Sequence, residues 1–295
     1  MKNRFDIVAI VMGVAFGVMW ASAFTSARVI VAHAPPLHAL AIRFLISGLI
    51  GVGIARALGQ SWSLTRRQWI ATAVFGICQN GLYLGLNFVA MQTVEASLAA
   101  IIASSMPLLV ALAGWLIFRE TMPRLGVAGL VAGVAGVALI MGARLQGGAD
   151  LFGVLLCIVA VVSLTVATLM VRGASSGGNF LMIVGLQMLI GSAVLWVPAL
   201  LFETLVIDWT WQLGVAFTYT VLVPGLAATL VWFLLVHRIG AVRAAVFHFL
   251  TPFFGVFIAS LFLGERLSRW DLSGVAIITA GILAVQLAKQ KPAQT

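Results

Sequence analysis

The chain has 295 residues, of which 62% are hydrophobic and only 8% are charged, and its mean hydropathy is +1.15. A globular protein in water cannot cover its surface with so few charges, so the composition excludes a soluble fold and indicates a membrane protein. In a soluble chain the formal net charge of +9 would suggest a nucleic-acid partner. Here it fits arginine-rich loops beside a lipid bilayer, and we expect no nucleic-acid partner.

Apolar stretches of about 20 residues, each long enough to cross a bilayer, recur along the whole chain. In the first half we expect spans near residues 7–31, 37–58, 69–91, 94–118 and 125–143. In the second half we expect them near residues 151–172, 180–202, 211–236, 242–263 and 271–288. The first span resembles a signal peptide, but Trp20 interrupts that pattern, and we expect it to be retained. The predicted fold is an all-α integral membrane protein with ten transmembrane helices.

The segment Glu95–Glu120 recurs without a gap at Gly240–Glu265, which indicates an internal duplication. Under this shift of 145 residues the rare residues of the two segments coincide: Pro107 with Pro252, Glu120 with Glu265, Arg124 with Arg269, Gly129 with Gly274 and Gly136 with Gly281. A shared apolar composition does not align helix breakers and charges in this way. The predicted units are residues 1–145 and 146–295, each a repeat of five helices.

An odd number of helices per repeat means that the second repeat enters the membrane inverted relative to the first. Inverted repeats are typical of secondary transporters, whose substrate site lies near the middle of the membrane where the repeats meet. Lysine and arginine predict which end is cytoplasmic. With both termini inside, that side collects Lys2, Arg4, Arg56, Arg66, Arg67, Arg119, Arg124, Arg172, Arg238, Arg243, Lys289 and Lys291.

Polar side chains on one face of the third span are the best candidates for a site. Gly76, Asn80, Tyr83 and Asn87 follow a helical spacing, and Gln79 lies beside them. Such a face either forms hydrogen bonds between helices or lines a cavity. In the eighth span Thr218, Gly225, Thr229 and Trp232 are predicted to share a face, on which Gly225 corresponds to Asn80 and Trp232 to Asn87.

Two prolines and two ionisable residues stand within other spans. Pro107 and Pro252 each remove a backbone donor, so each marks either a hinge or a static kink. His248 is interpreted as a hydrogen-bonding residue of a cavity, because no second ligand stands at metal-binding spacing. Arg43 in the second span either reaches the interface, pairs with carbonyl groups, or meets an anionic group of a substrate; the first two are favoured.

Several features of other protein classes are absent from the sequence. No acidic residue is predicted at mid-membrane, which disfavours a site for permanently cationic drugs, and no nucleophile–base pair or phosphate-binding loop is present. Cys78 and Cys157 lie in apolar stretches, so we expect no disulfide. We therefore expect no catalytic residues, no metal and no cofactor.

The motif Trp20-Ala21-Ser22-Ala23-Phe24, the pair Arg43-Phe44 and the duplicated segment together resemble the drug/metabolite transporter superfamily. This resemblance implies two inverted five-helix EamA repeats around a central cavity. The chain is similar to the YddG-type amino-acid exporters, which implies a bacterial inner-membrane location and a wall formed partly by Trp20. Ser163 stands in the second repeat where members of this family often keep another tryptophan, so we do not expect a strict preference for aromatic amino acids.

The composition and the inverted duplication predict a secondary transporter that works by alternating access. The resemblance implies export of small metabolites, with amino acids as the favoured substrates, across a bacterial inner membrane. The predicted substrate-binding residues are Trp20, Asn80, Tyr83, Asn87, Ser163, Trp232 and His248, with Pro107 and Pro252 as hinges. The expected partners are a small-molecule substrate and the lipid bilayer, and the sequence is compatible with a monomer. The alternatives are export of other small solutes or drugs by the same fold, an intramembrane enzyme, and an accessory membrane protein.

Overall fold

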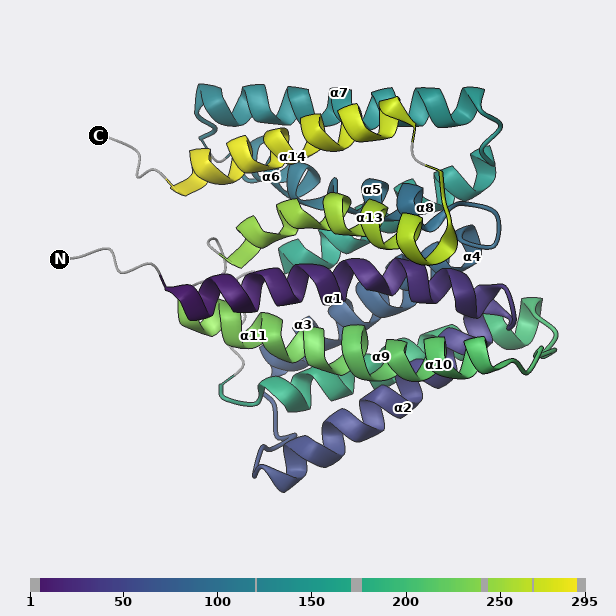
Figure 1. Cartoon of the computed structure of the whole chain (residues 1–295). Coiled ribbons are helices and arrows are strands. Elements are labelled where there is room, and N and C mark those ends of the chain that lie inside the picture. The colour runs from purple at the N-terminus through teal and green to yellow at the C-terminus, as the bar shows by residue number, and fades with distance from the viewer. Residues whose placement is uncertain (1–5, 120, 171–176, 240–243, 267, 291–295) are drawn as a thin grey trace.

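The computed structural model describes residues 6–119, 121–170, 177–239, 244–266 and 268–290. The described residues of the first half form α1 (Ile7–Val31), α2 (Pro36–Ala57), α3 (Arg66–Phe75), the π-helical η1 (Gly76–Tyr83), α4 (Leu84–Ala90), α5 (Ala96–Ala103), α6 (Met106–Leu116) and α7 (Arg124–Gln146). Those of the second half form α8 (Leu151–Met170), α9 (Phe180–Phe202), α10 (Trp211–Thr220), the π-helical η2 (Val221–Ala227), α11 (Ala228–Ile239), the 3-10 helix η3 (Ala245–Leu250), α13 (Thr251–Leu263) and α14 (Arg269–Gln290). Figure 1 shows these helices as one bundle.

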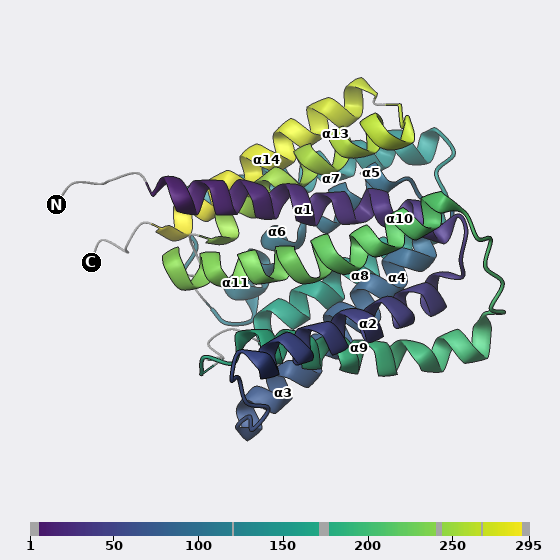
Figure 2. The ribbon, with the colours of Figure 1, turned by 60° about the horizontal axis from the view of Figure 1, so that its bottom comes forward.

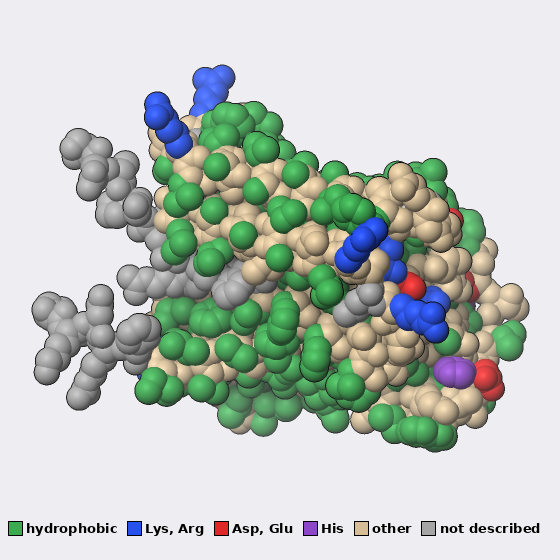
Figure 3. Space-filling model, turned by 45° about the horizontal axis from the view of Figure 1, so that its top comes forward, with side chains coloured by type: hydrophobic (Ala, Val, Ile, Leu, Met, Phe, Trp, Pro, Cys, Tyr) green, Lys and Arg blue, Asp and Glu red, His purple; other side chains and the backbone are tan. Residues whose placement is uncertain are grey.

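The predicted membrane spans are confirmed. Among the described residues, nine helices are long and apolar enough to cross a bilayer, and the shorter α13 directly follows η3 to complete a tenth span. Apolar side chains cover the middle of the face in Figure 3, and charged side chains lie toward its ends. Lys2, Arg4, Glu120, Arg172, Arg243 and Lys291, which entered the predictions above, lie outside the described residues.

The crossing of α7 and α14 shows the inverted symmetry directly. A Cβ atom on Gly281 would lie 2.6 Å from the carbonyl oxygen of Gly129, and one on Gly274 would lie 3.1 Å from that of Gly136. Under the shift of 145 residues, Gly129 corresponds to Gly274 and Gly136 to Gly281. Each contact is therefore the symmetry mate of the other, and the two helices run antiparallel. Only glycine allows backbones to approach so closely.

The crossing of α2 and α9 repeats this arrangement. A Cβ atom on Gly48 would lie 3.0 Å from the carbonyl oxygen of Gly185, and the Ser192 hydroxyl donates a hydrogen bond of 2.8 Å to the carbonyl oxygen of Ala41. A shift of 144 residues exchanges these two contacts. Two pairs of corresponding helices thus meet across one pseudo-two-fold axis, as inverted repeats require.

The first helix of each repeat packs into the other repeat. Helix α1 packs against α10, α11 and α13 of the second half, whereas α8 packs against η1, α4, α5 and α6 of the first half. Figure 2 shows α1 running across the bundle beside the helices of the second half. The α5–α6 span is the most buried of the bundle, with 72% of its apolar window inside the protein. The two repeats therefore interlock around a shared centre.

The two ends of the bundle differ in charge. Both termini lie at the same end (Figure 1), together with Arg56, Arg66, Arg67, Arg119, Arg124 and Arg238. With the exception of Asp6, the acidic residues that the structure describes lie at the opposite end: Glu95, Asp150, Glu203, Asp208, Glu265 and Asp271. The bias predicted from the sequence therefore coincides with the two ends of the folded bundle.

Acidic residues at this second end hold the two repeats together. The Glu265 carboxylate accepts hydrogen bonds from the backbone N–H groups of Ala96 (2.8 Å) and Ser97 (3.0 Å) and so caps α5. Arg144 pairs with the fully buried Asp271 at 2.9 Å and also with Glu95. Glu265 and Asp271 belong to the second repeat and their partners to the first, so these contacts stabilise the inverted assembly.

Candidate functional site

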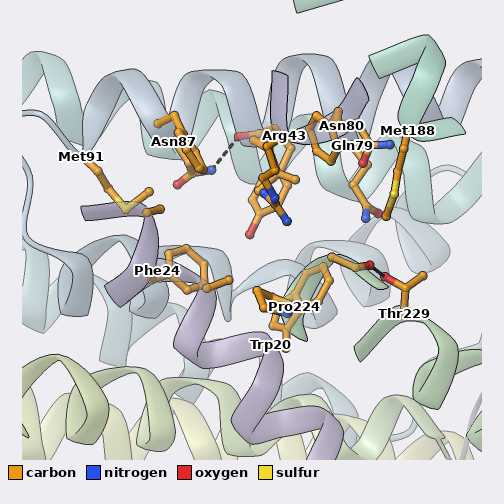
Figure 4. Close-up of a pocket in the computed structure, with 17 residues that line it drawn as sticks. Trp20, Phe24, Arg43, Gln79, Asn80, Asn87, Met91, Met188, Pro224 and Thr229 are labelled. Atoms are coloured by element: carbon orange, nitrogen blue, oxygen red, sulfur yellow. Dashed lines mark hydrogen bonds between the residues drawn. The ribbon is translucent and has the colours of Figure 1, made fainter. Parts of the chain in front are cut away.

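A central cavity lies where the two repeats meet. About 570 Å³ of space there is not filled by protein atoms, open solvent at its mouth included. Its walls come from α1, α2, η1, α4, α9, η2 and α11. The lining residues are Trp20, Ala23, Phe24, Ala27, Arg43, Phe44, Gln79, Asn80, Tyr83, Leu84, Asn87, Phe88, Met91, Met188, Pro224, Gly225 and Thr229. Figure 4 draws these residues around the cavity.

The polar face of the third span is part of this wall. Asn80, Tyr83 and Asn87 are each at least 98% buried and line the cavity, with Gln79 beside them. The Asn80 amide also donates a hydrogen bond of 3.0 Å to the carbonyl oxygen of Gln187 in α9. Asn80 therefore does both things that the sequence allowed for this face: it forms a hydrogen bond between helices and it lines the cavity.

Asn87 presents an unused acceptor. Its side-chain NH₂ donates a hydrogen bond of 2.8 Å to the carbonyl oxygen of Tyr83 (Figure 4). Because a carbonyl oxygen only accepts, this bond fixes which end of the amide is the NH₂ group. The buried Oδ1 atom of Asn87 has no hydrogen-bond partner among the described residues.

The eighth span lines the cavity with smaller side chains than the third span. Pro224, Gly225 and Thr229 line the cavity, and the Thr229 hydroxyl donates a hydrogen bond of 2.7 Å to the carbonyl oxygen of Gly225. The prediction that Thr218 shares their face is wrong, because Thr218 lies on the exposed side of α10. The π-helical η2 separates Thr218 from the lining residues, and its wider turn rotates the preceding helix relative to the helix that follows.

Trp20 lines the cavity and also belongs to an aromatic cluster, whose other members are Phe16, Trp232 and His248. The ring of His248 lies 5.2 Å from that of Phe16, 6.2 Å from that of Trp20 and 5.0 Å from that of Trp232, measured between centroids. Phe16 and Trp232 lie 4.8 Å apart. The cluster therefore lies beyond Trp20, toward the end of the bundle that holds both termini. Of its members only Trp20 lines the cavity.

Ser163, Pro107 and Pro252 are not among the residues that line the cavity. The Ser163 hydroxyl donates a hydrogen bond of 2.9 Å to the carbonyl oxygen of Cys78, within the π-helical η1. Pro107 stands at the start of α6 and Pro252 at the start of α13, so both proline-containing spans are interrupted at corresponding positions. The hydroxyls of Ser104 and Ser105 donate to the carbonyl oxygens of Ile101 and Ile102 at the first interruption.

Arg43 lines the cavity, although the sequence favoured a role at the interface or in structural pairing. Its side chain is 4% exposed, and its guanidinium carbon lies 5.0 Å above the ring of Phe44. Its Nε atom has no hydrogen-bond partner, and no described carboxylate lies within ion-pair distance. In Figure 4 its nitrogen atoms point into the cavity. The sequence signal was a lone arginine in the interior of an apolar span, which is costly unless it has a function.

A second hollow opens at the acidic end of the bundle. It contains about 1300 Å³ of empty space, open solvent included, and its wall includes Arg28, His33, Glu95, Glu265 and Arg266. The Arg28 guanidinium donates a hydrogen bond to the carbonyl oxygen of Met91, a residue of the central cavity. This contact therefore stands between the outer hollow and the central cavity.

Inverted repeats that enclose a central cavity with polar walls are typical of membrane transporters of small solutes. The sequence pattern of the EamA-like transporter family matches residues 7–142 and again residues 151–287. The chain therefore belongs to the EamA-like transporter family, within the drug/metabolite transporter superfamily, which places it among transporters rather than enzymes.

Individual proteins show the same relationship. The chain is 29% identical over 269 residues to "Uncharacterized transporter YvbV" of Bacillus subtilis, covering 91% of this chain and 88% of that protein. It is 31% identical over 113 residues to "Aromatic amino acid exporter YddG" of Ancylobacter novellus, which covers 38% of this chain and 39% of the exporter. A solved crystal structure with 20% sequence identity superposes with a TM-score of 0.71, covering 97% of this chain and 99% of the other, and so shows the same fold.

Proposed function

We propose that the protein exports amino acids and similar small metabolites through the central cavity by alternating access. The observation that carries this proposal is the chemistry of the wall. Amide, phenol and indole groups from Asn80, Tyr83 and Trp20 surround the space, and none of the described lining residues is acidic. An unpaired cation would meet a large desolvation penalty in such a cavity, whereas a zwitterion or a neutral solute finds hydrogen-bond partners there. The partial similarity to an amino-acid exporter supports the same substrate class.

We infer further that the end holding both termini faces the cytoplasm of a bacterium. The excess of arginine at that end supports this orientation. The aromatic cluster then lies on the cytoplasmic side of the cavity, and the hollow beside Arg28 opens to the outside. The units 1–145 and 146–295 act together in this proposal, because each contributes part of the cavity wall.

The direct test is efflux from liposomes that contain the purified protein. The liposomes are loaded with labelled amino acids, purines, sugars or a quaternary ammonium dye, and efflux is followed with and without a pH gradient. We expect efflux of at least one amino acid above that from protein-free liposomes, and no efflux of the dye. Movement of the dye without movement of any amino acid would contradict the proposal. A rate that responds to the pH gradient identifies proton coupling.

A further inference from the structure

We propose that the central cavity binds the two charged groups of an α-amino acid at separate points, with Arg43 holding the carboxylate and Asn87 Oδ1 accepting from the ammonium group. This inference rests on the proposed function and names the groups that recognise the substrate. It starts from two polar groups that line the same cavity and lack partners among the described residues, the Arg43 guanidinium and the Asn87 oxygen.

Arg43 is the stronger of the two observations. Arginine stays protonated in proteins, so its guanidinium is a permanent cation. At 4% exposure in the middle of a membrane bundle it has lost most of its water, and no described carboxylate replaces that water. A buried charge without a partner is strongly unfavourable, which points to a ligand that supplies the partner. The guanidinium fork matches a carboxylate in two parallel hydrogen bonds.

Gly225 of the second repeat lies beside the Arg43 side chain. A Cβ atom on Gly225 would lie 3.7 Å from Nη2 of Arg43 and 3.3 Å from the Ser47 hydroxyl oxygen. Gly225 corresponds to Asn80 of the first repeat, so an amide there would meet the guanidinium. The second repeat thus places no side chain at the position where the first repeat places a polar one.

Asn87 supplies the complementary group. Its NH₂ group donates to the carbonyl oxygen of Tyr83, which leaves Oδ1 as an acceptor in a fixed position. Asn87 as a whole is 1% exposed. A cation that enters this cavity meets an acceptor at Asn87 but is repelled by Arg43. A molecule with a carboxylate and a neighbouring ammonium group satisfies both sites at once, which favours a zwitterion over either an amine or a simple acid.

The test compares ligands that differ by one group at a time. Purified protein in lipid nanodiscs is titrated with the twenty proteinogenic amino acids, with quenching of tryptophan fluorescence as the signal, because Trp20 lines the cavity. The tightest binder is then compared with its carboxamide, which lacks the carboxylate, and with the matching carboxylic acid, which lacks the amino group. The variants are Arg43→Gln, Asn87→Leu and, as a matched control, Arg124→Gln at an exposed position.

We expect Arg43→Gln to weaken binding of the amino acid and of the carboxylic acid at least about tenfold. It should not weaken binding of the carboxamide, a cation that Arg43 repels. Asn87→Leu should weaken the amino acid and the carboxamide but not the carboxylic acid, and Arg124→Gln should change none of them. Without ligand, Arg43→Gln should unfold at the same temperature as the parent protein or a higher one, because it removes an unpaired buried charge. That result separates loss of binding from loss of fold.

Equal weakening of the acid and the carboxamide by Arg43→Gln, or a lower unfolding temperature, would overturn the assignment of Arg43. Amino-acid efflux that is indifferent to Arg43→Gln would leave the proposed function in place and remove only this inference. Carboxylic acids that depend on Arg43 and bind as tightly as the matching amino acids, with no effect of Asn87→Leu on the amino acids, would keep the anchor and remove the amino-acid assignment. A protein that binds no amino acid and no carboxylate overturns both.

Discussion

The third and eighth spans have the same backbone and different chemistry. Each contains a π-helical segment, Gly76–Tyr83 in the first repeat and Val221–Ala227 in the second, and a shift of 145 residues places one start on the other. Both segments line the cavity, yet the first presents Asn80 and Tyr83 where the second presents Gly225. A wider turn in corresponding places shows that the distortion belongs to the repeated scaffold. The side chains were then free to diverge.

Under the proposed function, the symmetry of the backbone serves alternating access and the asymmetry of the side chains serves binding. A transporter that alternates between two openings needs two halves that move in equivalent ways, which the repeated backbone provides. A small solute needs one set of contacts, and two identical polar walls would compete for it. The first repeat therefore carries the hydrogen-bonding groups, and the second gives room to the Arg43 side chain opposite them.

The largest expected effect concerns the inversion itself. Single cysteines are introduced at Arg119 and at Arg266, in loops that correspond between the repeats, after Cys78 and Cys157 are replaced by alanine. We expect an impermeant thiol reagent applied from outside to label the second position and to leave the first unlabelled, because the loops lie at opposite ends of the bundle. Labelling of both from one side would contradict the inverted arrangement in the membrane.

A smaller but still large effect is expected at the polar face of the third span. Asn80→Ala and Tyr83→Phe each remove a buried hydrogen-bonding group, which typically costs about 1–3 kcal/mol, or roughly ten- to hundredfold in affinity. We expect the half-saturating concentration for amino-acid efflux to rise by that factor. Leu82→Ala, on the exposed side of the same π-helical segment, serves as the control and should leave it unchanged.

A substitution at Trp232 distinguishes an effect on solute binding from an effect on the rate of transport. Trp232 corresponds to Asn87 but lies in the aromatic cluster beyond Trp20 and does not line the cavity. We expect Trp232→Leu to lower the maximal efflux rate several-fold. The half-saturating concentration should change by less than about threefold, because a solute that does not touch Trp232 loses far less than the 1.4 kcal/mol that makes a tenfold change in affinity. An equally large change in the half-saturating concentration would instead place Trp232 in direct contact with the solute.

The prolines test whether corresponding breaks in two helices are hinges. Alanine at Pro107 or Pro252 restores a backbone donor and favours a continuous helix. We expect efflux to fall several-fold in each variant while the protein still elutes as a single symmetric peak in size-exclusion chromatography. If both variants transport at the parental rate, the breaks are static kinks.

The smallest effect is expected at the surface contact between the start of α1 and the end of α11. Arg238 donates a hydrogen bond of 2.7 Å to Asp6, and this bond is the main cause of the lowered pKa of the Asp6 carboxyl. The contribution of the pair to stability is present at neutral pH and is lost only as the pH falls through that lowered pKa, below 3.8. We expect Asp6→Asn to lower the unfolding temperature slightly at pH 7, with no further change at pH 5. A difference that grew on acidification would contradict this sign.

The spans could be predicted from the sequence because lipid demands long apolar segments, and α1 and α9 begin and end at the predicted residues. The π-helical segments could not be predicted, since a turn with one extra residue has no clear sequence signal, and they account for the misplaced Thr218. The position of Arg43 in the cavity depends on how α2 packs against its neighbours, which no local pattern encodes.

The central claim is that the solute passes through the cavity between the polar face of the third span and the eighth span. It is tested most directly by a cysteine at Thr229, a lining residue of the second repeat, in the protein without its native cysteines. We predict that a small membrane-permeant thiol reagent modifies this cysteine and that the transported amino acid slows the modification in proportion to its occupancy, while a cysteine at the exposed Gly214 reacts at a constant rate. Modification of Thr229→Cys at the same rate with and without a saturating transported solute would contradict the account.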